Sequence, residues 1–261
     1  MRTNWLAYLI PLALLGGCGG ADPTSDTAMV SAALDSSDQT ANESALMLAT
    51  TSGTDGAGSA SAAATMAGTQ ARTFWQPAAC VTSTQQNNIV TYQLADCTGP
   101  YGLVHVTGSV VVTYTVDAGG VHAAAVANGL HVNGATMNLA STATYTVNGT
   151  AKKLIVMTDG GGVGAFGNAI ARNGSYTLAW DDASQCGSLD GAWSTQIGAD
   201  TWSTSIANFA VCKAHCPSSG TLSHTGGISK VTATVTFDGS AEARWSTSRG
   251  RSGTIALFCS P

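Results

Sequence analysis

Six of the seven cysteines, spread between residues 80 and 259, carry the clearest chemistry in this sequence. An even number of cysteines in an exported chain predicts disulfide bonds, because the compartment beyond the inner membrane is oxidising. Six cysteines allow fifteen pairings. Proximity along the chain favours Cys80 with Cys97, and each bridge should stabilise the fold by about 2 to 4 kcal/mol. The other pairs that we expect are Cys186 with Cys212 and Cys216 with Cys259.

A metal ion is the rival interpretation of the same cysteines. Cys212, His215 and Cys216, with His224 further along, have a spacing that zinc tolerates. Thiolates in an oxidising compartment are readily oxidised, so disulfides are the better prediction. We therefore expect no metal site here.

The acidic residues give little support for hydrolytic chemistry. Residues 73 to 261 contain eight Asp and a single Glu, Glu242, whereas glycoside hydrolysis needs two opposed carboxylates. Asp181, Asp182 and Asp190 are close in sequence and could hold calcium. They lack the Asp-x-Asp-x-Asp-Gly pattern, so we interpret them as turn-forming residues.

The chain also lacks a strong motif for a nucleophile or a nucleotide. Neither Gly-x-Ser-x-Gly nor Ser-x-x-Lys occurs. Gly162, Gly164 and Gly167 match the spacing of the dinucleotide fingerprint, but no helical pattern follows them, and we interpret them as a glycine loop. We predict no catalytic residue and no cofactor. A hydrolase whose site is assembled from dispersed Asp, Ser and His residues is kept as an alternative.

Tryptophans provide the candidate binding residues. Tyr176, Leu178 and Trp180 share one parity, as a core-facing row of a strand does. Trp193 and Trp202 are less constrained by their neighbours, and we predict that these two are exposed for ligand binding. Exposed tryptophans of this kind would suit a carbohydrate-binding module, which is the second function that we consider.

The N-terminus has the pattern of an export signal. A charged start is followed by an apolar run, Trp5 to Leu15, that is too short to span a membrane. Its end, Leu15-Gly16-Gly17-Cys18, resembles the lipobox of bacterial lipoproteins. That resemblance implies a diacylglycerol on Cys18, which would anchor the protein to a membrane. Gly19 follows rather than Asp, which in that family favours the outer membrane.

Residues 19 to 72 are rich in Ser, Thr, Ala, Gly and Asp. Such a composition buries too little apolar surface to offset the entropy of ordering, so we predict a disordered tether with a reach of roughly 40 Å. Within it, 28–34 and 43–49 are expected to form only transient helix. Residues 73 to 261 follow as one β-rich domain. That domain carries nine acids and eight bases, and without a basic patch we expect no nucleic-acid partner.

Alternation with period two dominates the domain after Asn87. Val104, Val106, Val110, Val112 and Tyr114 belong to one apolar row. Little helix is expected, and the fold class is an all-β antiparallel meander or Greek key, arranged as a sandwich of two sheets or alternatively as a barrel. The predicted tight turns are Asn128-Gly129, Asn133-Gly134, Asn148-Gly149, Asn173-Gly174, Asp190-Gly191 and Asp238-Gly239.

The last hairpin permits a prediction of register. A two-residue loop at Asp238-Gly239 would mix apolar and polar residues on each face. A loop with an odd number of residues keeps the faces separate. It places Val235 opposite Ala241 and Val231 opposite Trp245.

The C-terminal segments resemble those of uncharacterised β-rich lipoproteins that are numerous in myxobacteria. The segments are Cys216 to Gly220, Val235 to Ser240, Thr247 to Thr254 and the closing Cys259. The resemblance implies a lipid anchor and a disulfide-bonded β domain, and it implies no activity. We therefore expect an exported, lipid-anchored, non-enzymatic protein. It either binds an envelope or surface macromolecule, with a glycan as one option, or has a structural role in the envelope.

Overall fold

The computed structural model describes residues 43–99, 104–165, 167–198, 200–213, 215–226, 230–257 and 259. The predicted export signal, Cys18 and the first part of the predicted tether lie outside these residues. Thirteen strands are present in the described part: β1 (Val81–Gln86), β2 (Ile89–Thr98), β3 (His105–Asp117), β4 (Gly120–Val132), β5 (Ala135–Asn148), β6 (Ala151–Val163), β7 (Ala169–Asp181), β8 (Cys186–Ile197), β9 (Asp200–Cys212), β10 (Ser219–Gly226), β11 (Val231–Phe237), β12 (Glu242–Thr247) and β13 (Ser252–Ala256).

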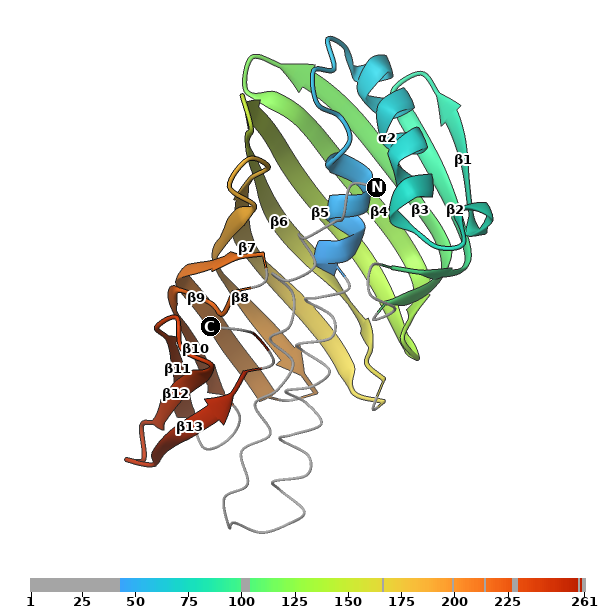
Figure 1. The fold of residues 1–261 in the computed structure, drawn as a ribbon. Helices are drawn as coiled ribbons and strands as arrows, with labels where there is room; N and C mark the ends of the chain where they lie inside the picture. Colours follow the sequence, from blue (N-terminus) through green and yellow to red (C-terminus); the bar gives the residue numbers. More distant parts are fainter. Residues whose placement is uncertain are drawn as a thin grey trace.

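Every strand pairs with the next one along the chain, so the thirteen strands form one antiparallel meander (Figure 1). The predicted all-β antiparallel class is confirmed. The two packed sheets and the closed barrel are wrong, because a single open sheet runs from β1 to β13. Short connections bring each strand back beside the previous one, and helices, not a second sheet, cover the N-terminal part of the apolar face.

One face of this sheet forms the core, and we call it the core face. On β3, Val106, Val110, Val112 and Tyr114 are buried and alternate with more exposed residues. This is the row that the sequence predicts. The same alternation buries Tyr176, Leu178 and Trp180 on β7, as predicted. The opposite face of the sheet is called the outer face below.

Two helical segments lie on the core face, and they correct the predicted tether. Residues 43–51 form a helix, and α2 (Ala60–Phe74) follows it. The prediction of a disordered tether over 19–72 is therefore wrong for residues 43 to 72. The buried side of α2 consists mainly of alanines: Ala63, Ala64, Ala67 and Ala71. Alanine is the best helix former and permits a close approach to the sheet, although it adds little to apolar patterning.

Figure 1 shows α2 in front of β1 to β3 and the 43–51 helix in front of the middle of the sheet. The Ser59 hydroxyl caps α2 by accepting a hydrogen bond from the Ala62 N–H at 3.2 Å. A short 3-10 turn, η2 (Ala78–Cys80), then leads into β1. None of the helices in the described ranges is long and apolar enough to cross a membrane.

Three of the six predicted turns are hairpin turns, and three lie inside strands. Asn133-Gly134, Asn148-Gly149 and Asp238-Gly239 connect neighbouring strands. Asn128-Gly129 and Asp190-Gly191 lie at irregularities of β4 and β8. Asn173-Gly174 is paired within β7, where a Cβ on Gly174 would stand 2.5 Å from the Trp193 Cβ. Packing beneath a tryptophan, and not a turn, explains that glycine.

The last hairpin has the predicted parity but a different register. Val235 lies opposite Trp245, not opposite Ala241. The Asp238 carboxylate accepts hydrogen bonds from the Ser240 N–H and hydroxyl and also pairs with Arg244. These contacts stabilise a longer loop than the one predicted. The predicted separation of faces survives because the loop still has an odd number of residues.

The three predicted disulfides are confirmed. Cys80–Cys97 joins the start of β1 to β2, Cys186–Cys212 joins β8 to β9, and Cys216–Cys259 holds the C-terminal end. Three disulfides indicate an oxidising, extracytoplasmic environment. Cys212 and Cys216 are bonded to different partners, and no group of three or more metal-ligating side chains occurs among the described residues.

Candidate binding face

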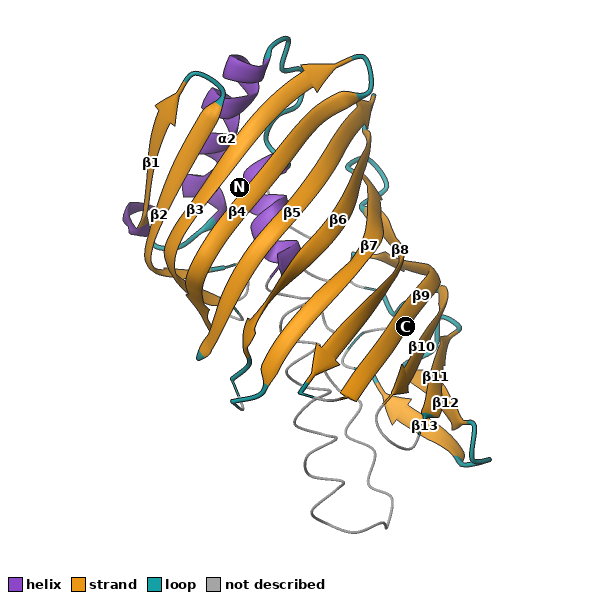
Figure 2. Ribbon diagram, turned by 180° about the vertical axis from the view of Figure 1, so that it is seen from behind, coloured by secondary structure: helices purple, strands orange, loops and turns teal. Residues whose placement is uncertain are grey.

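The outer face of the sheet is the accessible one. Seen from behind in Figure 2, the strands β1 to β13 form a continuous surface on which no described helix lies. Residues that pair across neighbouring strands point to the same face, so the register of the meander determines which side chains stand side by side there.

One row of side chains crosses the entire outer face, and we call it the outer row. It contains one residue from every strand, each paired with the next, so it extends over roughly 60 Å at about 4.8 Å per strand. No member is charged, and eight of the thirteen carry a hydroxyl group. The members in strand order are Gln86, Ile89, Thr113, Ala124, Thr142, Met157, Ser175, Ala192, Ser205, Ser223, Thr234, Ser246 and Ser252.

A second row runs beside the outer row over β7 to β11. It contains Asn173, Ser194, Ser203, Thr225 and Thr232. The hydroxyls of Thr225 and Thr232 are 2.7 Å apart and hydrogen-bonded. From β7 to β11 the two rows therefore place a lattice of small polar groups on the surface. Over β2 to β6 the same face is more apolar, and Met157 has 64% of its surface exposed.

A hollow of about 340 Å³ lies within this lattice, and we call it the serine hollow. It exists because the side chains around it are short. Beneath it lie Gly174, which has no side chain, and Trp193 and Thr204, whose side chains are buried on the core face. Its outer-face lining residues are Asn173, Ala192, Ser194, Ser203, Ser205, Ser223 and Thr225. Two carboxylates flank it, because Asp159 pairs with Asn173 and Asp190 lies two residues before Ala192.

A second, shallower hollow of about 560 Å³ lies near the other ends of the same strands. Ala179, Ser188 and Ala210 contribute small side chains to it, and Lys153 and Asp181 lie at its border. Both hollows are thus formed where small residues from several neighbouring strands meet on the outer face.

Trp193 and Trp202 do not form the predicted exposed pair. They are 8% and 5% exposed and lie on the core face of the adjacent strands β8 and β9. The Arg172 guanidinium lies 4.9 Å from the centre of the Trp193 ring, and Trp202 stacks on His224 with 5.1 Å between ring centres. Leu189 and Ile197, which share the parity of Trp193, are the signal that sequence reasoning missed.

Charged groups on the core face hold the helices in place. Arg172 on β7 is 2% exposed, and its Nε lies 3.7 Å from the Glu43 carboxylate on the 43–51 helix. The same carboxylate accepts a hydrogen bond from the Ser141 hydroxyl at 2.5 Å. Burial lowers the pKa of Arg172 and raises that of the neighbouring Tyr176. These contacts join helix and sheet, which makes the cluster structural.

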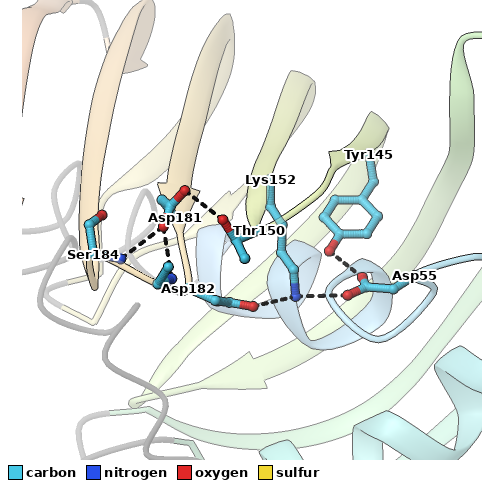
Figure 3. Close-up of polar contacts among 8 residues, drawn as sticks. Asp55, Tyr145, Thr150, Lys152, Asp181, Asp182 and Ser184 are labelled. Atoms are coloured by element: carbon cyan, nitrogen blue, oxygen red, sulfur yellow. Dashed lines mark hydrogen bonds and ion pairs between the residues drawn. The ribbon is translucent and has the colours of Figure 1, made fainter.

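A polar network fixes the loop between the two helices (Figure 3). The Lys152 ammonium on β6 lies 2.7 Å from the Asp55 carboxylate and 2.8 Å from that of Asp182. Tyr145 donates a further hydrogen bond to Asp55. Burial by itself lowers the Lys152 pKa, but the contacts with Asp182 and Asp55 outweigh it and raise that pKa. The network ties the helical layer to β5, β6 and the β7–β8 turn.

The three aspartates considered for calcium have separate structural roles. Asp181 caps the β7–β8 turn by accepting hydrogen bonds from the Ala183 and Ser184 N–H groups at 2.8 Å (Figure 3). Asp182 pairs with Lys152, and Asp190 accepts a hydrogen bond from the Asn208 N–H at 2.6 Å. The interpretation as turn-forming residues therefore fits Asp181 and Asp182, whereas Asp190 lies within β8 at its irregularity and not in a turn.

One cluster has the residue types of a catalytic triad, namely an acid, a histidine and a hydroxyl: Asp117, His122 and Thr144. Both contacts of the His122 ring, to Asp117 and to the Thr144 hydroxyl, are 3.0 Å long. The Asp117 side chain is 66% exposed and also accepts a hydrogen bond from the Gly119 N–H. That N–H therefore stabilises the turn and is not directed at a position near Thr144 where an oxyanion would form. We assign the cluster to the β3–β4 turn.

No family model, curated protein or solved structure matches the chain.

Proposed function

We propose that this protein is a lipid-anchored protein of the cell envelope whose β domain is a non-catalytic binding module. The outer row and the serine hollow on the outer face are its binding surface. Support for the anchor comes from Leu15-Gly16-Gly17-Cys18 and the apolar run before it. Support for the module comes from the difference between the two faces, because the helices and the clusters around Arg172 and Lys152 occupy the core face.

The observation that carries the proposal is the outer row. Thirteen consecutive strands place an uncharged residue at the same level of the outer face, and this pattern leaves a continuous accessible surface. Core packing does not require it, because these positions face away from the helices. A long uncharged surface is suited to a partner that contacts several strands at once.

The anchor is tested by replacing Cys18. We expect the wild-type chain in the membrane fraction of its host and Cys18→Ser in the soluble fraction, because the thioether-linked lipid is then missing. The measurement is an immunoblot of both fractions after a high-salt wash. Cys18→Ser that stays with the membrane would contradict the anchor, provided that its disulfides are intact.

The binding face is tested with the soluble Cys18→Ser chain and delipidated envelopes of the host. Ser205→Glu places a charge in the serine hollow, and we expect binding to weaken at least tenfold. Thr82→Glu is the matched control, because Thr82 is exposed on β1, two rows away from the outer row. If both variants bind as well as the Cys18→Ser chain, with unchanged melting temperatures, the outer row and the serine hollow are not the binding surface.

A further inference from the structure

We propose that the ligand of the outer face is an uncharged polysaccharide, bound as a single chain that crosses the strands along the outer row and occupies the serine hollow. This inference rests on the proposed function and names its ligand class. Trp193 lies beneath the hollow with its ring buried on the core face, so the proposal assigns no stacking role to Trp193 or Trp202.

The charge of the surface selects an uncharged ligand. The outer row contains no charged residue, no lining residue of the serine hollow is charged, and the carboxylates of Asp159 and Asp190 lie beside it. A polyanion such as a nucleic acid, an acidic glycan or an anionic membrane would meet no counter-charge among these lining residues and would be repelled by the two carboxylates. An uncharged polymer avoids that cost.

The chemistry of the lining selects a ligand rich in hydroxyls. A serine or threonine hydroxyl both donates and accepts hydrogen bonds, and a sugar hydroxyl does the same. The two sets can therefore pair in many orientations. A protein partner would instead use buried aromatic or arginine anchors. The side chains that the outer face contributes to the serine hollow contain neither type.

The repetition of the surface selects a polymer over a single sugar. Each hydroxyl exchanges a hydrogen bond with water for one with the ligand, so a single contact adds little affinity. Contacts repeated on successive strands act together, because once the first contact has formed, each further contact forms within the same complex. Affinity should therefore rise with chain length, and free monosaccharides should not compete.

The twist of the sheet selects a flexible chain over a rigid crystal surface. Adjacent strands rotate by about 20 to 25° relative to each other, so a row over thirteen strands cannot lie flat on a crystalline fibre. A single polysaccharide chain can follow the rotation. Soluble and amorphous forms of the polymer should bind, and crystalline forms should not.

The test uses polysaccharides released from envelopes of the host, separated by anion exchange into uncharged and acidic fractions. The soluble Cys18→Ser chain is run in native gels that contain either fraction. We expect the uncharged fraction to retard it, and Ser205→Glu to reduce the apparent affinity at least tenfold. Thr82→Glu is again the control, and gels without polysaccharide correct for the added charge. Fragments long enough to cross several strands should compete, whereas mono- and disaccharides should not.

Retardation by the acidic fraction alone, or by neither fraction, would overturn the inference. The proposed function is judged separately by binding to delipidated envelopes. If Ser205→Glu weakens that binding while the uncharged fraction has no effect, the outer face is the binding surface but its ligand is not a neutral glycan. Protease treatment of the envelopes then shows whether the partner is a protein. If Ser205→Glu changes neither measurement, both proposals fail.

Discussion

At the scale of single residues, Lys152 connects the helical layer to the sheet. Its side chain is 12% exposed and lies between the carboxylates of Asp55 and Asp182, which are 40% and 47% exposed. Removing the ammonium group leaves two carboxylates facing each other without compensation. We expect Lys152→Met to lower the free energy of unfolding by about 1 to 2 kcal/mol, less than for a fully buried pair because solvent screens the carboxylates.

Urea unfolding measures this loss, and the pH dependence identifies its origin. The Lys152 pKa is raised above its usual 10.5 in the folded chain. The ion pairs therefore stabilise the fold fully below pH 10.5, and their contribution is lost as the pH rises through the raised value. Lys152→Met should lack this alkaline loss. The control is Lys153→Met, since Lys153 points to the outer face. A similar loss of stability in both variants would contradict the role of Lys152.

At the scale of elements, α2 shows how a helix without large apolar residues is held on the sheet. Its buried side is made of alanines, and Gly68 brings the helix so close to β1 that an added Cβ would lie 3.3 Å from the Ser83 hydroxyl oxygen. Ala67→Leu forces three extra carbons into this contact. We expect a loss of about 1 to 3 kcal/mol, because overpacking moves the helix or strains the side chain.

Thermal unfolding followed by circular dichroism tests this prediction. Thr69→Leu on the exposed side of the same helix is the control, and it should leave the melting temperature nearly unchanged because leucine is a good helix former. If Ala67→Leu is as stable as the control, α2 is not closely packed against the sheet.

The same helix explains where sequence reasoning succeeded and failed. Alternation predicted the rows of β3 and β7, because the residues that face the core are large and apolar. The alanine face of α2 produces no comparable signal, so its composition predicts a tether and not a helix. The outer row cannot be predicted from the sequence, because it depends on the register of twelve successive strand pairs. A shift of one residue in any pair would move every later member to the other face.

At the scale of the whole molecule, the C-terminal end of the open sheet should be less stable than its interior. Strands β4 to β8 are 12 to 14 residues long and have paired neighbours on both sides. At the C-terminal end, β11, β12 and β13 shorten from 7 to 6 to 5 residues, and most of their side chains are only partly buried or exposed. Local unfolding should therefore begin at β11 to β13.

The Cys216–Cys259 bridge limits that local unfolding, because it closes a loop of 43 residues that contains β10 to β13. In hydrogen exchange of the soluble Cys18→Ser chain, amides of β4 to β8 should exchange most slowly and those of β11 to β13 faster. Replacing Cys216 and Cys259 together by Ser should accelerate exchange in β11 to β13, with a loss of protection of about 2 to 4 kcal/mol. Replacing Cys186 and Cys212, which join the interior strands β8 and β9, is the matched control and should leave β11 to β13 at their original rates. Equal acceleration throughout the sheet in both variants would mean that the thirteen strands unfold as one cooperative unit, and that the C-terminal end has no separate stability for the bridge to support.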